Sequence, residues 1–151
     1  ITTDIIVGFP GETEEEFKTT CDFAKKVSFA QIHVFKYSRR HGTVADRMED
    51  QVDEQVKNSR SDRLLAIEAE LEKQYQQKFP DQTQKVLIEE PVLIEETKYL
   101  VGYNERYIRI AVPYEEGVSD ESLCNSLIDV HINGSLEGDI LLGKRERACN
   151  L

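Results

Sequence analysis

The fold of the first half of this chain is decided by the stretch Thr3-Asp4-Ile5-Ile6-Val7-Gly8-Phe9-Pro10-Gly11-Glu12-Thr13. Its apolar run, residues 3–7, ends at glycine and proline, which predicts a parallel-sheet strand that is buried on both faces. Thr13 and Glu16 then have the spacing of a capping box, and apolar residues recur at helical spacing over residues 17–27. Residues 31–35 predict a second strand. Strand, helix and strand together predict a βαβ unit with parallel strands.

The carboxyl ends of the two predicted strands are the first places to look for a site, because function gathers there in such folds. The first end comprises Gly8, Phe9, Pro10, Gly11 and Glu12. Glycine permits the backbone to come close to a ligand. The alternative is a tight turn between strand and helix, in which Glu12 serves the helix start.

The second carboxyl end, residues 36–43, is the most concentrated basic stretch of the chain and contains Tyr37, Ser38, Arg39 and Arg40. An arginine here could bind a carboxylate or a phosphate with two hydrogen bonds. The alternative is a solvated basic loop in which Arg40 pairs with an acidic residue, Asp46 or Glu49.

The pattern changes at residue 53, where residues 53–79 predict one long amphipathic helix that Pro80 ends. Its apolar stripe would consist of Val56, Leu64, Ile67, Leu71, Tyr75 and Phe79. After Pro80, five strands are predicted, over residues 85–89, 91–95, 107–113, 128–132 and 139–142. Turns are predicted at Gly102, Gly117, Asn133-Gly134 and Gly138. Five short strands of this size indicate a small antiparallel barrel of the OB-like class, so the fold class is α/β followed by all-β.

Basic and aromatic residues on the predicted barrel are candidates for RNA binding, since OB-like surfaces combine stacking with positive charge. They are Lys85, Arg106, Tyr107, Arg109 and Lys144. The alternative is an ordinary strand face of mixed charge. Tyr107 alternates with Ile108, so one of the two is expected to point inward.

The composition limits the partners and the compartment. The 151 residues carry a net charge of −10, of which −3 falls on residues 1–79 and −7 on residues 80–151, so the chain has no general attraction for nucleic acid. Aliphatic runs are at most three residues long, which excludes a membrane-spanning helix. Cysteines 21, 124 and 149 and three dispersed histidines form no metal motif. We expect a reduced, cytoplasmic protein in which His33 and His131 are packed. Because the sequence opens on Ile1 in a strand-like run, we also expect it to be a piece of a longer chain.

Three ordered motifs closely resemble the radical S-adenosyl-L-methionine (SAM) methylthiotransferases. They are residues 3–13, residues 33–45 (His-Val-Phe-Lys-Tyr-Ser-Arg-Arg-His-Gly-Thr-Val-Ala), and residues 48–52 (Met-Glu-Asp-Gln-Val) followed by Lys57. The resemblance implies the C-terminal part of such an enzyme. Residues 1–52 would be the last units of the radical SAM (β/α) barrel, residues 53–79 a connecting helix and residues 80–151 a TRAM domain. Residues 8–12 with Tyr37, Ser38 and Arg39 would then contact SAM, and Arg40 would join the barrel residues in binding RNA.

The resemblance is greatest to the branch that methylthiolates N6-threonylcarbamoyladenosine beside the tRNA anticodon. It implies the anticodon stem-loop of tRNA as partner. Lys36 and Val44 stand where that branch usually has proline. Lysine before Tyr-Ser also occurs in the sister branch that modifies an aspartate of a ribosomal protein, so both substrates stay open, as does a non-catalytic RNA-binding module.

The family's reaction needs two 4Fe-4S clusters, which are held by a CxxxCxxC motif and by N-terminal cysteines that this chain lacks. We therefore expect the chain to be inactive by itself. The barrel fragment would leave an open strand edge, which predicts a homodimer through that edge.

Overall fold

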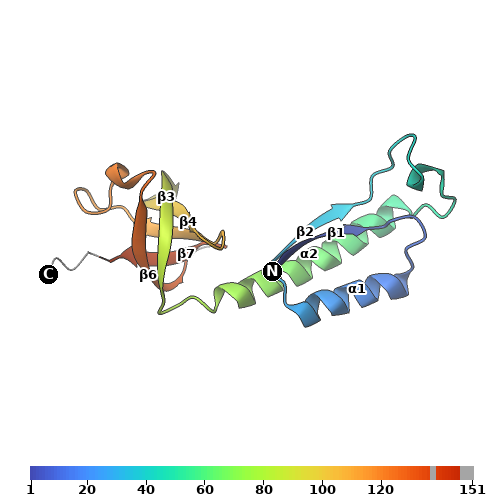
Figure 1. Ribbon diagram of the computed structural model, residues 1–151, viewed down its shortest axis with the longest axis horizontal. Helices are drawn as coiled ribbons and strands as arrows, with labels where there is room; N and C mark the ends of the chain where they lie inside the picture. The colour runs from blue at the N-terminus through green and yellow to red at the C-terminus, as the bar shows by residue number, and fades with distance from the viewer. Residues whose placement is uncertain (137–138, 147–151) are drawn as a thin grey trace. The chain divides into compact units, whose positions relative to one another are not determined.

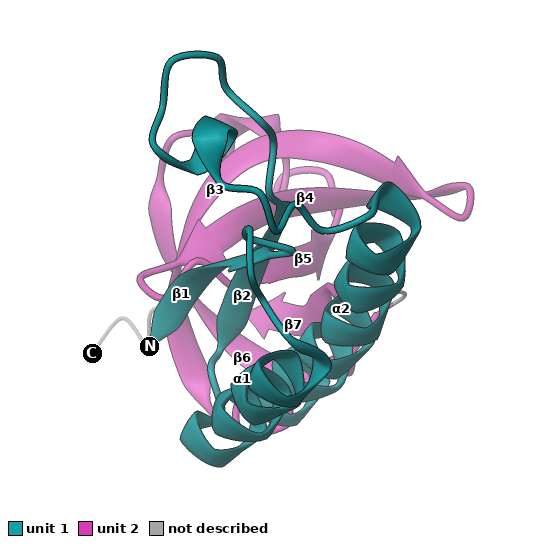
Figure 2. Ribbon diagram, turned by 90° about the vertical axis from the view of Figure 1, so that its right-hand side faces the viewer, with its two compact units in different colours: residues 1–75 teal, residues 76–151 magenta. Residues whose placement is uncertain are grey.

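The structure, a computed structural model, describes residues 1–136 and 139–146, so Cys149 lies outside the described residues. The chain divides into two units, Ile1–Tyr75 and Gln76–Leu151, which Figure 2 distinguishes by colour. The first unit contains parallel strands and helices, and the second consists mainly of strands.

The first unit begins with the predicted βαβ arrangement (Figure 1). Strand β1 (Thr2–Val7), helix α1 (Glu14–Val27) and strand β2 (Gln31–Lys36) follow one another, and the two strands pair in parallel from Thr2 opposite Gln31 to Val7 opposite Lys36. The predicted capping box starts α1: the Thr13 hydroxyl accepts from the Glu16 amide at 3.2 Å, and the Glu16 carboxylate accepts from the Thr13 amide at 2.8 Å.

One face of this two-stranded sheet is covered by helices and the other is not. The core combines residues of both strands, α1 and α2 (Glu54–Gln76), and its buried members are Val7, Phe17, Cys21, Ala24, Phe29, Ile32, Leu64 and Leu71. On the opposite face Ile6 and Phe35 are about half exposed, and His33 is exposed as well. The predicted burial of the first strand on both faces, and of His33, is therefore wrong for this chain.

The long helix is confirmed as α2, but its buried stripe differs from the prediction. Leu64 and Leu71 are buried as expected, whereas Val56 is exposed and the first turns bury Lys57 and Arg60 instead. The helix ends at Gln76, so the buried Phe79 lies beyond it. Among the described residues no helix is both long and apolar enough to cross a membrane.

The second unit is a closed barrel of five strands. These are β3 (Thr83–Ile94), β4 (Thr97–Asn104), β5 (Arg109–Pro113), β6 (Leu127–Ser135) and β7 (Leu141–Arg145), and they close in the order β3-β4-β5-β7-β6. The size and the closure agree with the OB-like class. The prediction of a purely antiparallel barrel is wrong, because β5 and β7 pair in parallel.

Three local predictions in the barrel are also corrected. The segments 85–89 and 91–95 form one strand, β3, with a bulge between Ile88 and Glu90 rather than a break. Gly102 is not a turn but the middle of β4, where an added Cβ would lie 1.9 Å from the Leu87 carbonyl oxygen. Asn133-Gly134 lies inside β6, at another bulge, and not in a hairpin turn. Among the described glycines of this set only Gly117 lies in a turn, with φ +73°, and the predicted turn at Gly138 lies outside the described residues.

Candidate functional site

The turn that follows β1 depends on two glycines with left-handed backbone. Gly8 has φ +72° and Gly11 has φ +86°, values that residues other than glycine rarely adopt. The Glu12 amide donates to the Phe9 carbonyl at 2.9 Å, and the Gly11 amide donates to the Asp50 carbonyl at 2.8 Å. The turn is thus closed on itself and held by the segment that leads into α2.

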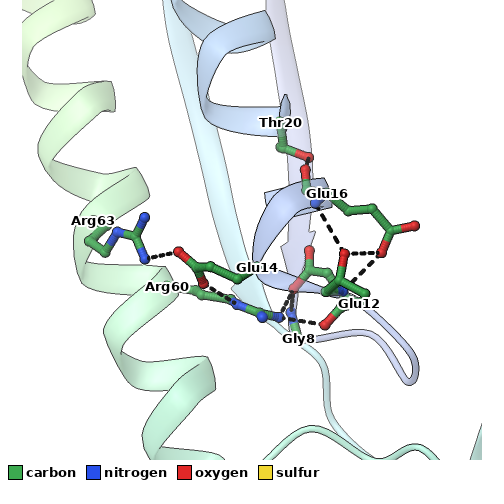
Figure 3. Close-up of polar contacts among 8 residues, drawn as sticks. Gly8, Glu12, Glu14, Glu16, Thr20, Arg60 and Arg63 are labelled. Atoms are coloured by element: carbon green, nitrogen blue, oxygen red, sulfur yellow. Dashed lines mark hydrogen bonds and ion pairs between the residues drawn. The ribbon is translucent and has the colours of Figure 1, made fainter. Parts of the chain in front are cut away.

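Glu12 is the centre of this turn (Figure 3). Its Oε2 accepts from the Gly8 amide at 2.6 Å and lies 2.6 Å from Nη1 of Arg60, which also donates to the Glu12 carbonyl at 3.0 Å. The Glu12 side chain is 14% exposed and that of Arg60 is 6% exposed. The Glu12 carboxylate therefore ties the turn to α2, while Thr13 and Glu16 cap the helix; a contact of Glu12 with SAM stays a prediction.

Glu14, in the first turn of α1, pairs with both arginines of α2: Arg60 Nε lies 3.6 Å from Glu14 Oε2, and the pair with Arg63 is open to solvent. Arg63 Nη1 lies 2.6 Å from Glu14 Oε1, and these side chains are 49% and 59% exposed. The hydrogen bond from Arg63 lowers the pKa of Glu14. Both guanidinium groups lie over the Phe17 ring, Arg60 at 5.6 Å and Arg63 at 4.7 Å.

The turn that follows β2 meets the turn that follows β1. The Tyr37 amide donates to the Val7 carbonyl at 2.9 Å, and the Tyr37 ring meets the Phe9 ring edge-on at 5.3 Å. Lys57 of α2 contacts both turns. Its Nζ donates to the Tyr37 carbonyl at 3.3 Å, and its Cγ would lie only 2.3 Å from a Cβ added to Gly8. The Tyr37 hydroxyl is buried and has no hydrogen-bond partner among the described residues.

The basic loop beyond Tyr37 is organised by Asp46. Arg39 donates from Nε to Asp46 Oδ1 and from Nη2 to the Asp46 carbonyl, both at 2.7 Å, and the Gly42 amide donates to Oδ2 at 3.1 Å. The hydrogen bond from Arg39 lowers the pKa of Asp46. Asp46 is thus the partner of Arg39, and within the described part of the chain Arg40, which is exposed like Ser38, forms no ion pair with Asp46 or Glu49.

Three of the predicted RNA-binding residues lie where β4 leads into β5: Arg106 and Tyr107 are on the turn, and Arg109 is the first residue of β5. Tyr107 is 86% exposed with φ +58°, and Ile108 points inward, which confirms that the two residues face opposite ways. The guanidinium of Arg106 lies 5.7 Å from the Phe79 ring centre. Arg109 has a buried Nε without a hydrogen-bond partner among the described residues.

The other two candidates lie on separate strands. Lys85 of β3 pairs with Asp129 of β6 at 3.2 Å, with both side chains largely exposed. Lys144 of β7 lies opposite His131 of β6 and is exposed, whereas His131 is half-buried. These positions therefore form a mixed-charge surface rather than one basic patch.

The described residues do not fit an iron–sulfur cluster. Among them no group of three or more histidine, cysteine or acidic side chains could hold a metal ion. Cys21 is buried in the core of the first unit, where burial raises the pKa of its thiol, and Cys124 lies in the barrel unit. An organic ligand such as SAM fits better, because the unpartnered Tyr37 hydroxyl and the Phe9–Tyr37 pair lie at the carboxyl ends of both strands.

Arg60 was missed by the sequence reasoning, and Lys57 was noted only as the end of a motif. A signal for both was present: positions 57, 60 and 64 follow the helical spacing that continues to Leu71. Charged residues are seldom fully buried, so the sequence pattern favours Val56 over Lys57 and Arg60 on the buried face of the helix.

Comparison with known proteins gives a consistent group of relatives. No protein-family model matches the chain. The threonylcarbamoyladenosine tRNA methylthiotransferase MtaB of Bacillus subtilis is 48% identical over 111 residues, which is 73% of this chain and 25% of that protein. The tRNA-2-methylthio-N(6)-dimethylallyladenosine synthase of Acetivibrio thermocellus is 41% identical over 145 residues, or 93% of this chain and 29% of the relative.

A third relative modifies a protein rather than tRNA, according to its name. The ribosomal protein uS12 methylthiotransferase RimO of Clostridioides difficile is 37% identical over 140 residues, or 92% of this chain and 31% of the relative. The chain thus spans roughly a quarter to a third of the length of the curated relatives it matches. Because matches to all three kinds of enzyme cover most of its residues, the chain belongs to the methylthiotransferase family.

Proposed function

We propose that this chain is the C-terminal part of a radical SAM methylthiotransferase that adds a methylthio group to N6-threonylcarbamoyladenosine in tRNA. The observation that carries the proposal is the meeting of two motif turns, through Phe9 and Tyr37, at the carboxyl ends of parallel strands. The relative from Bacillus subtilis, which carries this substrate in its name, supports the choice of branch. A cytoplasmic location is part of the proposal.

In this proposal SAM, when bound, supplies the adenosyl and methyl groups for the reaction. Phe9 and Tyr37 would offer it an apolar wall, and the Tyr37 hydroxyl, which has no partner among the described residues, would donate a hydrogen bond to it. Gly8 and Gly11 let the backbone approach, while Ser38 and Arg39 lie on the loop that continues from Tyr37. The iron–sulfur clusters are held by residues of the longer enzyme, since the described residues do not fit one.

The barrel would dock the anticodon stem-loop in the same proposal. Tyr107, which is exposed at the turn between β4 and β5, can stack on an unpaired base, and Arg106 on the same turn and Arg109 at the start of β5 can pair with the RNA backbone. Arg40, Lys85 and Lys144 would add positive charge at separate places.

The decisive experiment is nucleoside mass spectrometry of tRNA from a strain that lacks the full gene. We expect methylthiolated threonylcarbamoyladenosine to disappear and its unthiolated precursor to accumulate. A plasmid copy of the full gene should reverse both changes. Unchanged tRNA nucleosides, in a strain with no second enzyme for this modification, would overturn the tRNA proposal.

A ribosomal-protein substrate is the second candidate, and the charge of the chain supports it. Residues 80–151 carry a net charge of −7, which suits a basic ribosomal protein better than RNA. The lysine before Tyr-Ser, Lys36, also fits this branch. Its Nζ donates to Asn58 Oδ1 at 2.8 Å. The same deletion strain would then keep its tRNA nucleosides and lose the methylthio mass from an aspartate of a ribosomal protein.

A non-catalytic RNA-binding module is the third candidate. It predicts that residues 80–151 bind RNA on their own and that the full-length protein has no affinity for SAM. Calorimetric titration of the full-length protein with SAM separates this candidate from both enzymes.

We also propose that the 151-residue chain is inert alone. Iron analysis after anaerobic reconstitution should find no stoichiometric cluster, and a stoichiometric 4Fe-4S cluster would contradict this.

A homodimer is proposed for the isolated chain because β1 pairs only with β2 among the described strands, which leaves its other edge open. Light scattering should give twice the chain mass at high concentration, and a monomer there would dismiss the dimer.

A further inference from the structure

Arg60 contacts the turn after β1 in a way that an ordinary ion pair between helices would not require. A single nitrogen, Nη1, lies 2.6 Å from the Glu12 carboxylate and 3.0 Å from the Glu12 carbonyl (Figure 3). The same carboxylate oxygen accepts the Gly8 amide at 2.6 Å. Arg60 therefore fixes both the backbone and the side chain of Glu12, and through Glu12 it fixes Gly8.

Lys57 lies three residues before Arg60, on the same face of α2. It also contacts the turn that follows β1. Its stem fills the space beside Gly8, and its Nζ donates to the Tyr37 carbonyl. Lys57 and Arg60 are both about 95% buried. Together they hold the two turns whose Phe9 and Tyr37 rings meet.

We propose that Arg60 is a positioning residue that sets the conformation of residues 8–12, so that Phe9 is held against Tyr37 in the geometry the ligand needs. The identity of that ligand as SAM rests on the proposed function. Loss of Arg60 leaves the largely buried Glu12 carboxylate with the Gly8 amide as its one remaining hydrogen-bond donor among the described residues, and a charge that has lost its counter-ion turns toward solvent. The Gly8 amide then loses its acceptor and the turn opens.

The competing explanation is that Arg60 only fastens α2 to α1, since its Nε also lies 3.6 Å from Glu14 Oε2. Arg63 does that without touching the turn, since its partner Glu14 lies in the first helical turn of α1 and both groups are open to solvent. Arg63→Met is therefore the matched control for Arg60→Met: both remove a guanidinium from one face of α2, and only one reaches Glu12.

The first test is amide hydrogen exchange on the 151-residue chain. In Arg60→Met we expect the amides of Gly8 and Glu12 to exchange about tenfold faster or more, because each loses the closed turn that protects it. In Arg63→Met these amides should exchange as in the wild type, as should barrel amides in both variants. Equal exchange at Gly8 in Arg60→Met and in the wild type would overturn the proposal.

The second test is SAM affinity of the reconstituted full-length enzyme, measured by calorimetry. Arg60→Met should weaken SAM binding about 10- to 100-fold, since a displaced turn costs affinity even without a lost ligand contact. Arg60→Lys keeps the charge without the planar fork and should fall between Met and wild type. If Arg60→Met does not fold, Arg60→Lys alone decides both tests. SAM affinity that is unchanged in a folded Arg60 variant overturns the positioning role.

The two proposals fail in different ways. A wild-type full-length enzyme that binds no SAM refutes the proposed function, and the exchange test then decides Arg60 alone. A wild type that binds SAM together with an unchanged variant refutes the positioning role and leaves the proposed function standing.

Discussion

Replacing Gly8 with alanine tests whether α2 and the turn after β1 form one packed unit. Gly8 has φ +72°, and a Cβ there would lie 2.3 Å from Cγ and 3.1 Å from Cδ of Lys57. Ordinary contact begins near 3.4 Å, so the Lys57 stem must move by more than an ångström. Gly11 provides the control, because it has φ +86° and a Cβ added there would meet no atom within 4 Å.

The expected cost has two parts. Alanine in left-handed backbone costs about 1–2 kcal/mol at either position. At Gly8 the displaced Lys57, which is 4% exposed, also loses its hydrogen bond to the Tyr37 carbonyl, and a bond from a charged donor contributes about 1.5–3 kcal/mol. Gly8→Ala should therefore destabilise the first unit by about 2.5–5 kcal/mol and Gly11→Ala by about 1–2 kcal/mol.

Urea unfolding followed by far-ultraviolet circular dichroism measures this difference. The helical signal reports on the first unit, since α1 and α2 carry most of the helix of the described chain. The double variant Gly8→Ala/Lys57→Ala removes the clash, so its effect should be less than additive by about 1–2 kcal/mol. Equal losses in Gly8→Ala and Gly11→Ala, or full additivity in the double variant, would refute the packing argument.

The remaining predictions concern the barrel and the start of α1. In Gly102→Ala the added Cβ would lie 1.9 Å from the Leu87 carbonyl oxygen, so thermal unfolding should show the barrel destabilised by about 3 kcal/mol or more. In Gly134→Ala the added Cβ would meet no atom within 4 Å, so the loss of stability should be under about 1 kcal/mol. Equal losses in the two variants would contradict this prediction. Thr13→Ala removes the hydroxyl that caps α1 and should cost about 1 kcal/mol in urea unfolding, with an unchanged midpoint counting against the cap. The Thr13 amide lowers the pKa of Glu16, so folding is favoured above the usual glutamate pKa and less so below it; the urea midpoint should fall on acidification toward about pH 3, and a rising midpoint would contradict this.

The first half of the fold could be predicted because its signals are local. The capping box at Thr13, the apolar spacing of α1 and the glycine at the end of β1 each report on neighbours along the chain. A parallel pair then follows from the helix between the strands. The exposure of Ile6 and Phe35 could not be predicted in this way, because it depends on what covers the second face of the sheet.

The barrel was harder to predict because its deciding contacts lie across strands. Gly102 resembles a turn in the sequence, yet in β4 it makes room for the Leu87 carbonyl of β3. The parallel pairing of β5 with β7 joins Ile110 to Leu141, and no local pattern specifies it. Bulges in β3 and β6 shift the alternation by one residue, so a strict period of two breaks there.

The buried cations of α2 are the most informative departure from the prediction. Leu64 and Leu71 continue the same helix face into an apolar core, so Lys57 and Arg60 could have been apolar as well. A buried ion pair is seldom more stable than apolar residues of the same volume, so stability alone does not explain them. The charged positions contact the carboxyl-end turns of β1 and β2, while Leu64 and Leu71 belong to the apolar core. Buried helix positions are normally apolar, and Lys57 and Arg60 depart from this rule at the edge where a parallel sheet places its site. A functional constraint predicts such a departure, so the Arg60 experiment bears on function as well as on folding.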